Sequence, residues 1–219
     1  KVTGGAAQFT KVTQPVISSE AYHSSSGDFD NDGDLDIAIA TIYSGIKIAM
    51  NNGSGIFNSS QVISGGNPTY IYNTDIDNDG DLDIFVFDVY TTGVYLYLNN
   101  GSGVFNLFSS YSFGVNNVFY PETMNLDGDG RSEIIFAKIN SAVILKLSGN
   151  NLISSNLFTF TSELNSIKPG DLNNDGKTDF IATMTDSVKV MINNGNGTFN
   201  ETSIFITGNY PFAAPLFDI

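Results

Sequence analysis

The stretch DFDNDGDLD begins at residue 28 and recurs, in altered form, at three later places in the chain. The copies are DIDNDGDLD at 75, NLDGDGRSE at 125 and DLNNDGKTD at 171, so they are 47, 50 and 46 residues apart. A second motif keeps step with the first: NNGSGIF at 51, NNGSGVF at 99 and NNGNGTF at 193, with a degenerate copy, SGNNLIS, at 148. A period of about 20 to 50 residues indicates a repeat architecture, in which each unit packs against its neighbours.

Each unit contains short apolar segments that are typical of β-strands. In the second unit these segments are PTYIYNT, LDIFVFD, GVYLYLNN and GVFNLFS. They are rich in Val, Ile, Tyr and Phe and are separated by Gly, Asn and Ser, and no segment shows a sustained helical period. The Asn-Gly pair between the last two segments favours a tight hairpin turn. Four antiparallel strands in about 45 residues form one blade of a β-propeller, so the sequence predicts an all-β propeller of four-stranded antiparallel blades.

The repeats divide the chain into four complete units and two partial ones. We expect one partial propeller domain over residues 1–219, with complete units at about 19–64, 65–112, 113–161 and 162–208. Residues 1–18 match the last strand of a blade, and residues 209–219, which end in LFDI, match the first strand of another. We therefore expect the chain to be a fragment of a longer propeller. The alternative is a small propeller that is closed by its own terminal strands or by a second chain.

The charge balance narrows the range of partners. The chain has 23 acidic residues against nine Lys plus Arg, a formal charge of −14, and no Cys. A surface of this sign repels phosphate, so nucleic acid is not an expected partner. The absence of Cys excludes disulfides, zinc-thiolate sites and Cys nucleophiles. No apolar run reaches the about 18 residues that a membrane-spanning helix needs, so direct membrane insertion is not expected.

The acidic loops have the composition of calcium sites. If the Gly at position 6 makes a sharp bend, the side chains at positions 1, 3, 5 and 9 converge and position 7 adds a backbone carbonyl, which suits an ion that takes about six to eight oxygen ligands. The candidate metal ligands are Asp28, Asp30, Asp32, Asp36 and the carbonyl of Asp34; Asp75, Asp77, Asp79, Asp83 and the carbonyl of Asp81; Asn125, Asp127, Asp129, Glu133 and the carbonyl of Arg131; and Asp171, Asn173, Asp175, Asp179 and the carbonyl of Lys177.

An EF-hand is the obvious competing interpretation, and the residue at position 12 excludes it. An EF-hand loop needs a bidentate Glu at that position and flanking helices. The four loops have Ile39, Val86, Phe136 and Ala182 there, within strand-like runs. We expect about four calcium ions, one for each loop. Binding should be weaker at the third and fourth loops, because these have fewer carboxylates and place Arg131 or Lys177 beside the ion.

The whole pattern resembles a known repeat family. D-x-[DN]-x-D-G-x-x-D followed by two strands and N-G-x-G-x-F is similar to the FG-GAP or VCBS family of calcium-binding β-propeller repeats, found in integrin α-subunit heads and many bacterial surface proteins. The resemblance covers nearly the whole chain. The third unit departs from it, with Asn125 and Glu133 in the loop and no NNGxG motif. Such propellers usually close with about seven blades, which implies further blades of the same polypeptide outside this sequence.

Strand order places the acidic loops and the Asn-Gly turns on one rim, so a ligand face is expected on the other. That face would be formed by connectors at 41–45, 64–69, 88–93 and 112–117, because binding residues concentrate on loops that a rigid scaffold holds. Tyr43, Tyr90 and Tyr120 lie in or near these connectors and are either core residues or ligand contacts. His23, the only histidine, is expected to be an ordinary strand residue.

These observations favour a non-catalytic module of a secreted or cell-surface protein that binds an extracellular protein or glycan. The chain has no Cys, no His pair, no nucleophile elbow, no phosphate loop and no acid pair outside the acidic loops, so we predict no catalytic residue. Two alternatives stay open: the propeller scaffold of a larger extracellular enzyme, a lyase or hydrolase, or a purely structural component of a surface assembly.

Overall fold

The computed structural model describes residues 20–88, 90–114 and 118–206, and these form β-strands and connections with no helix. The part of the chain so described therefore contains no helix long and apolar enough to cross a membrane. The predicted terminal strands at 1–18 and 209–219 lie outside the described residues.

The strands form four antiparallel sheets of four strands each, paired in chain order. The first sheet contains β1 (Ala21–Gly27), β2 (Asp36–Thr41), β3 (Gly45–Asn51) and β4 (Phe57–Ile63), and the second contains β5 (Tyr70–Thr74), β6 (Asp83–Asp88), β7 (Gly93–Asn99) and β8 (Phe105–Ser112). The third contains β9 (Val118–Met124), β10 (Glu133–Lys138), β11 (Ser141–Ser148) and β12 (Asn151–Thr159), and the fourth contains β13 (Leu164–Gly170), β14 (Asp179–Met184), β15 (Ser187–Asn193) and β16 (Phe199–Ile206). The predicted all-β, propeller-like fold is confirmed.

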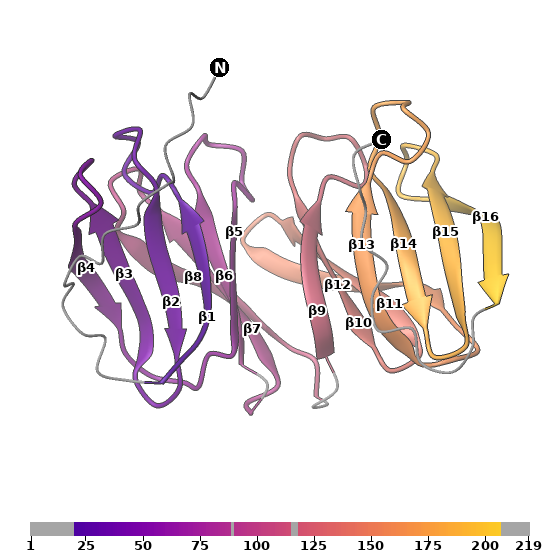
Figure 1. Cartoon of the computed structure of the whole chain (residues 1–219), viewed down its shortest axis with the longest axis horizontal. Coiled ribbons are helices and arrows are strands. Elements are labelled where there is room, and N and C mark those ends of the chain that lie inside the picture. The colour runs from indigo at the N-terminus through magenta and orange to yellow at the C-terminus, as the bar shows by residue number, and fades with distance from the viewer. Residues whose placement is uncertain (1–19, 89, 115–117, 207–219) are drawn as a thin grey trace, which may run out of the picture.

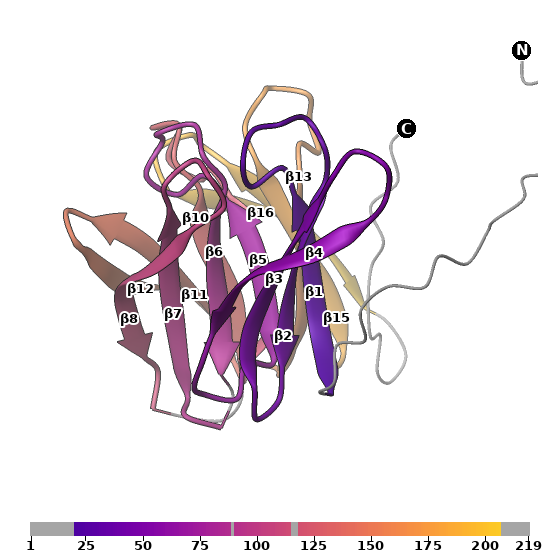
Figure 2. The same cartoon turned by 90° about the vertical axis from the view of Figure 1, so that its left-hand side faces the viewer.

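The sheets stand side by side, and corresponding ends point the same way (Figures 1 and 2). The acidic loops join the first strand of each sheet to the second, and they lie at the upper end in Figure 1, together with the turns between the third and fourth strands of the first, second and fourth sheets. We call this end the acidic rim. The opposite rim contains the connections between β2 and β3, β4 and β5, and β6 and β7. The two sets of loops are thus separated by the length of the strands, as predicted.

The core is divided among the interfaces between neighbouring sheets. One apolar cluster joins the first and second sheets, another the second and third, and another the third and fourth. Strand β6, with the sequence DIFVFD, is buried at every residue, because a second strand lies inside its sheet and contacts a neighbouring sheet on each face. This explains why the second strands have continuous apolar runs.

The turns between the third and fourth strands differ from the predicted tight hairpin. In the three units with an NNGxG motif, Asn51 pairs with Phe57, Asn99 with Phe105 and Asn193 with Phe199, so each turn contains five residues. The tight two-residue hairpin occurs in the unit that lacks the motif, where Ser148 pairs with Asn151. Gly149, with φ 57°, is the first central residue of this hairpin, the position where a type II′ turn requires Gly.

The strand-ending asparagines also join neighbouring sheets. The Asn99 Nδ2 donates to the Phe29 carbonyl of the first sheet at 2.8 Å, and the Asn193 Nδ2 donates to the Leu126 carbonyl of the third sheet at 2.9 Å. Both asparagines are buried. The corresponding residue of the third sheet is Ser148, whose side chain is too short to make this bond. Loss of the NNGxG motif therefore changes both a turn and the contact between two sheets.

We expect Asn99→Ala to lower the free energy of unfolding by about 2 kcal/mol, because the Phe29 and Leu82 carbonyls would lose a donor in a buried site. Asn51→Ala is the matched control, since within the described residues the Asn51 side chain donates only to the exposed Leu35 carbonyl of its own sheet. Urea unfolding of both variants measures the difference. Equal destabilisation by the two changes would contradict a role for Asn99 between the sheets.

Candidate metal centres

Each acidic loop is shaped by two residues in the left-handed region of backbone space. The residue at position 4 is Asn31, Asn78 or Asn174, with φ 60°, 64° and 58°, or Gly128, with φ 77°. The Gly at position 6 has φ between 80° and 95° in all four loops. Asn and Gly tolerate this conformation best, which explains the residue types at both positions. Sequence reasoning identified position 6 and missed position 4, although the Asn, Asn, Gly, Asn series was a visible signal.

The carboxylates at positions 1 and 5 accept hydrogen bonds from the backbone of their own loop. Asp28 accepts from the N–H groups of Asp32 and Gly33, at 3.1 and 2.9 Å. Asp171 does the same at the equivalent positions, and Asp75 accepts from three N–H groups. The position-5 carboxylate accepts from the N–H of position 7 in all four loops. These bonds fold the carboxylates inward toward a common centre.

The carboxylate at position 9 is buried and ties three segments together. Asp83 is 1% exposed, and it accepts from the N–H of Ile76 in its loop and from the N–H of Asn99 at the end of β7. Asp36 and Asp179 make the same two bonds with their own loops and third strands. Glu133 accepts from the Leu126 N–H. The position-9 carboxylate is therefore a candidate ligand, and in the first, second and fourth sheets it also links the acidic loop to the end of the third strand by hydrogen bonds.

In the first and second loops, the residue at position 3 has one carboxylate oxygen without a hydrogen-bond partner among the described residues. The Oδ1 atoms of Asp30 and Asp77 are buried, and no hydrogen bond reaches them in the described part of the chain, although each side chain as a whole is only half-buried. A buried carboxylate oxygen without a partner is costly, because its charge has lost water and gained nothing. A cation in the loop would supply the missing interaction, so the first and second loops fit a bound metal ion.

Three of the loops bring carboxylates together closely enough to hold a metal ion. The triads are Asp28, Asp30 and Asp32; Asp75, Asp77 and Asp83; and Asp127, Asp129 and Glu133, each with ligand oxygens within 4.8 Å of one another. The other predicted side-chain ligands of these loops, Asp36, Asp79 and Asn125, are outside the triads. Acidic clusters that can hold a metal ion are thus present on the acidic rim.

The fourth loop differs, since its described residues form no such triad. The Lys177 Nζ lies 2.8 Å from Asp175 Oδ2, and the Asn173 Nδ2 donates to the same oxygen at 3.3 Å. These contacts lower the pKa of the Asp175 carboxyl, chiefly through the Lys177 hydrogen bond. An ammonium group of the chain itself thus pairs with one of the carboxylates predicted to be a metal ligand.

The position-7 side chains pack over the neighbouring five-residue turns. A Cβ added to Gly53 or Gly101 would lie 2.6 Å from Asp34 Oδ2 or Asp81 Oδ2, so a larger residue would displace these carboxylates, and the φ values of 77° and 75° also favour glycine. Asp81 also accepts from the Asn31 Nδ2 at 2.7 Å, which joins the first loop to the second. The side chains of Asp34 and Asp81 therefore pack over the turns of their own sheets, and Asp81 also connects the first two acidic loops.

Burial raises the pKa of several loop carboxyl groups. Burial raises the pKa of Asp83 and of Glu133 to about 7, partly opposed by backbone hydrogen bonds to the carboxylates. The pKa values of Asp30 and Asp77 are also raised, first by burial and then by the neighbouring carboxylates of their loops. Without a cation the loops therefore hold negative charge that the structure does not fully compensate.

The other residues singled out in the sequence have varied environments. Tyr43 and Tyr90 are 83% and 63% exposed on the opposite rim, so neither is a core residue. The side chain of Tyr120 lies outside the described residues. His23 has the partners that the sequence did not reveal: its Nδ1 lies 2.9 Å from the Ile71 carbonyl, and its ring packs against Tyr70 and Tyr72. It is a strand residue that joins the first two sheets.

Comparisons with known proteins agree with this architecture. The family model for the FG-GAP-like repeat matches residues 28–74, 75–136, 125–182 and 171–219. A search of curated protein sequences finds no match. Among solved structures, the chain is similar to a lectin of Agrocybe aegerita, described in a study of specific recognition of non-reducing terminal N-acetylglucosamine, with 21% identity and a TM-score of 0.62 over 83% of this chain.

A second similar structure is BBS1N, solved in complex with ARL6DN and soaked with lead, with 14% identity and a TM-score of 0.58 over 92% of this chain. At these identities the two likenesses show a shared fold. The chain spans 50% of the length of the lectin chain and 59% of the length of the BBS1N chain.

The raised pKa values predict how the stability of the metal-free protein depends on pH. Between about pH 4 and pH 7 the folded state keeps protons on Asp83 and Glu133 that the unfolded chain releases. In EDTA the melting temperature should therefore fall as the pH rises from about 5 to about 8. Asp83→Asn should melt lower at acidic pH and show a shallower slope. A melting temperature that rises with pH in EDTA would contradict the prediction.

Proposed function

The chain belongs to the FG-GAP-like repeat family, and from this membership we propose that it is a calcium-stabilised propeller module of a secreted or cell-surface protein. We propose further that the module binds an extracellular ligand, a glycan in the first place, and catalyses no reaction. The single observation that carries the calcium proposal is the pair of buried, unpartnered Oδ1 atoms of Asp30 and Asp77.

The proposed ligands are the oxygen atoms at positions 1, 3, 5, 7 and 9 of the acidic loops. Bound calcium would neutralise the crowded carboxylates and keep the first two strands of each sheet in register. The residues themselves prepare the site: Asp28 and Asp75 are oriented by backbone N–H groups, and Asp83 is held by two N–H donors. We infer an affinity order in which the first two loops lead and the fourth, which contains the Lys177–Asp175 ion pair, is weakest.

The proposed location follows from the proposed ion. Extracellular calcium-binding modules have dissociation constants on the order of 10⁻⁴ to 10⁻³ M, so millimolar calcium outside the cell would fill such loops and resting cytosol would not. The acidic composition is consistent with this environment. Bound calcium would offset part of the formal charge of −14, and without it the carboxylates of the acidic rim would repel one another.

The ligand-binding proposal rests on the opposite rim. Tyr43 and Tyr90 are exposed at equivalent turns of the first and second sheets, and Tyr is among the residues enriched at binding hot spots. The likeness to a lectin supports a glycan as the ligand. A protein ligand is the second candidate, because the similar BBS1N structure was solved in complex with ARL6DN.

The calcium proposal predicts opposite effects of one substitution in the two metal states. In EDTA, Asp77→Asn should raise the melting temperature, because it removes a charge that neighbouring carboxylates repel and that has one buried oxygen without a partner. In millimolar calcium, the variant should lose the stabilisation from one site, on the order of 1 kcal/mol. Asp186→Asn is the control, since Asp186 is exposed and outside the loops. A wild-type calcium-induced shift in Asp77→Asn would contradict the second loop as a site.

A glycan array tests the binding proposal directly. The protein in about 2 mM calcium should bind a defined subset of immobilised glycans, and EDTA should reduce binding by destabilising the sheets. Tyr43→Ala and Tyr90→Ala should keep the wild-type melting temperature, because both side chains are exposed. Absence of binding to every glycan would reject the glycan proposal and leave the protein ligand as the candidate.

A further inference from the structure

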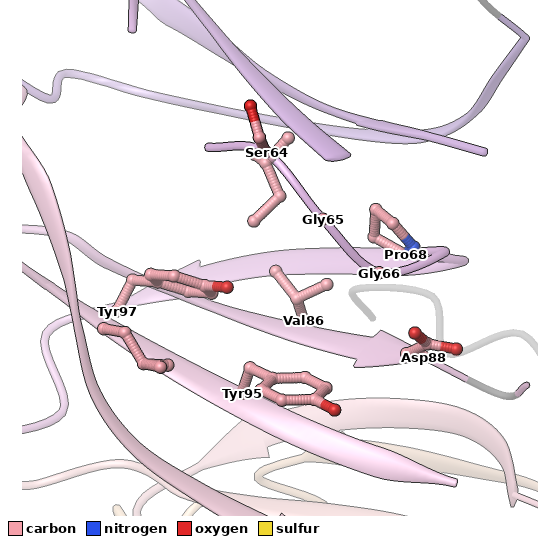
Figure 3. Close-up of a pocket in the computed structure, with 10 residues that line it drawn as sticks. Ser64, Gly65, Gly66, Pro68, Val86, Asp88, Tyr95 and Tyr97 are labelled. Carbon is pink, nitrogen blue, oxygen red and sulfur yellow. The ribbon is translucent and has the colours of Figure 1, made fainter. Parts of the chain in front are cut away.

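A cavity of about 220 Å³ lies between the first and second sheets on the opposite rim. Its walls come from the start of β3, the connection from β4 to β5, the end of β6 and the strands β7 and β8. Figure 3 shows the rings of Tyr95 and Tyr97 on one side, Val86 between them and the loop, and Ser64 and Pro68 on the other side. This cavity is remote from the acidic loops.

The cavity exists because small residues replace a cluster of three aromatic rings. At the interface between the second and third sheets, Phe87, Phe113 and Phe136 pack together, with ring centroids 5.8 to 6.4 Å apart. The residues in the same repeat positions at the interface between the first and second sheets are Ala40, Gly65 and Val86. Gly65 and Val86 line the cavity. The repeat scaffold is therefore the same at both interfaces, and smaller residues at the first of them line a cavity.

The polar groups of the cavity disfavour a charged ligand. Asp88 is 1% exposed, and its two carboxylate oxygens accept from the N–H groups of Asn67, Tyr90 and Thr91, each at 2.9 Å. Its charge is thus already stabilised by three donors, so the cavity does not require a cation. An anion would be repelled by Asp88 and by the formal charge of −14. The cavity suits a neutral ligand that carries hydroxyl groups.

The apolar walls complete the description of that ligand. Tyr95 and Tyr97 are two residues apart on β7, so both side chains project to the same face of the strand. The rings offer flat apolar surfaces, and the Tyr95 hydroxyl lies 3.2 Å from the Thr91 hydroxyl near the Asp88 end. The volume corresponds to about seven water molecules, which is sufficient for one sugar ring. Aromatic walls with a few fixed polar groups are typical of small-ligand sites.

We propose that this cavity binds a single neutral monosaccharide unit at the end of a glycan, with an apolar face of the sugar ring on Tyr95 or Tyr97 and hydroxyl groups directed to Ser64 and to the Tyr95 hydroxyl. The inference rests on the proposed glycan-binding function and assigns it to one place. It also assigns a role to Val86: its small side chain keeps the site open.

The test fills the cavity without removing a polar group. Val86→Phe introduces the residue that the third unit has at the same repeat position, and Tyr95→Ala removes one wall. Val62→Phe and Tyr22→Ala are matched controls, because these side chains are 51% and 59% exposed and outside the cavity. Thermal melting in calcium checks folding, and Tyr95→Ala carries the test if Val86→Phe does not fold.

Binding is measured first on a neutral-glycan array and then by saturation-transfer NMR with millimolar N-acetylglucosamine, galactose, mannose and fucose. We expect at least a tenfold loss of array binding in Val86→Phe and Tyr95→Ala, wild-type binding in the controls, and no signal from sialic acid. Wild-type binding in both cavity variants would overturn the assignment of the cavity and leave the proposed function intact. A wild-type protein that binds no glycan would overturn the assignment of the cavity together with the glycan proposal.

Discussion

The buried carboxylate at position 9 of each acidic loop is the interaction on which the rest of each sheet depends. Asp83 illustrates it: one oxygen accepts from the loop at Ile76, and the other accepts from the end of β7 at Asn99. The same carboxylate thus determines where the acidic loop closes and where the third strand ends. Asn99 also donates to the Phe29 carbonyl, so this chain of hydrogen bonds continues into the first sheet. A single residue of the motif therefore links the loop, the hairpin and the contact between sheets.

The third unit shows which of these features can occur without the others. It retains the position-9 carboxylate, as Glu133, and the bond to the loop at Leu126. It lacks the strand-ending Asn, and its third turn becomes a two-residue hairpin. The bulge that lies two residues before that Asn in the other three sheets is displaced to Ala142 and Val143. The acidic loop is therefore independent of the five-residue turn. The position of the bulge and the hydrogen bond between sheets change when the five-residue turn is lost.

The predictions that succeeded depended on residue types whose role is local. Gly at position 6 and the apolar run after position 9 were sufficient to predict the loops, the strands and the exclusion of an EF-hand, because backbone conformation and strand burial act within a unit. The five-residue turn was not predicted, because Asn-Gly is equally compatible with a tighter turn until the Asn52 carboxamide accepts from Ser54 and Ile56. The partners of His23 were also missed, because Tyr70 and Ile71 belong to the next unit.

The cavity between the first two sheets could not be predicted for the same reason. It is lined by Gly65, which follows the first sheet, and by Val86 of the second sheet, and a single unit gives no sign that these two small residues will border the same space. A repeat scaffold allows such changes, because each interface between sheets is packed by its own residues while the acidic rim keeps the sheets in register. The strongest sequence signal therefore lies where the units must be alike. The residues that distinguish one interface from another lie at the opposite rim, where variation costs the scaffold little and can create a binding site.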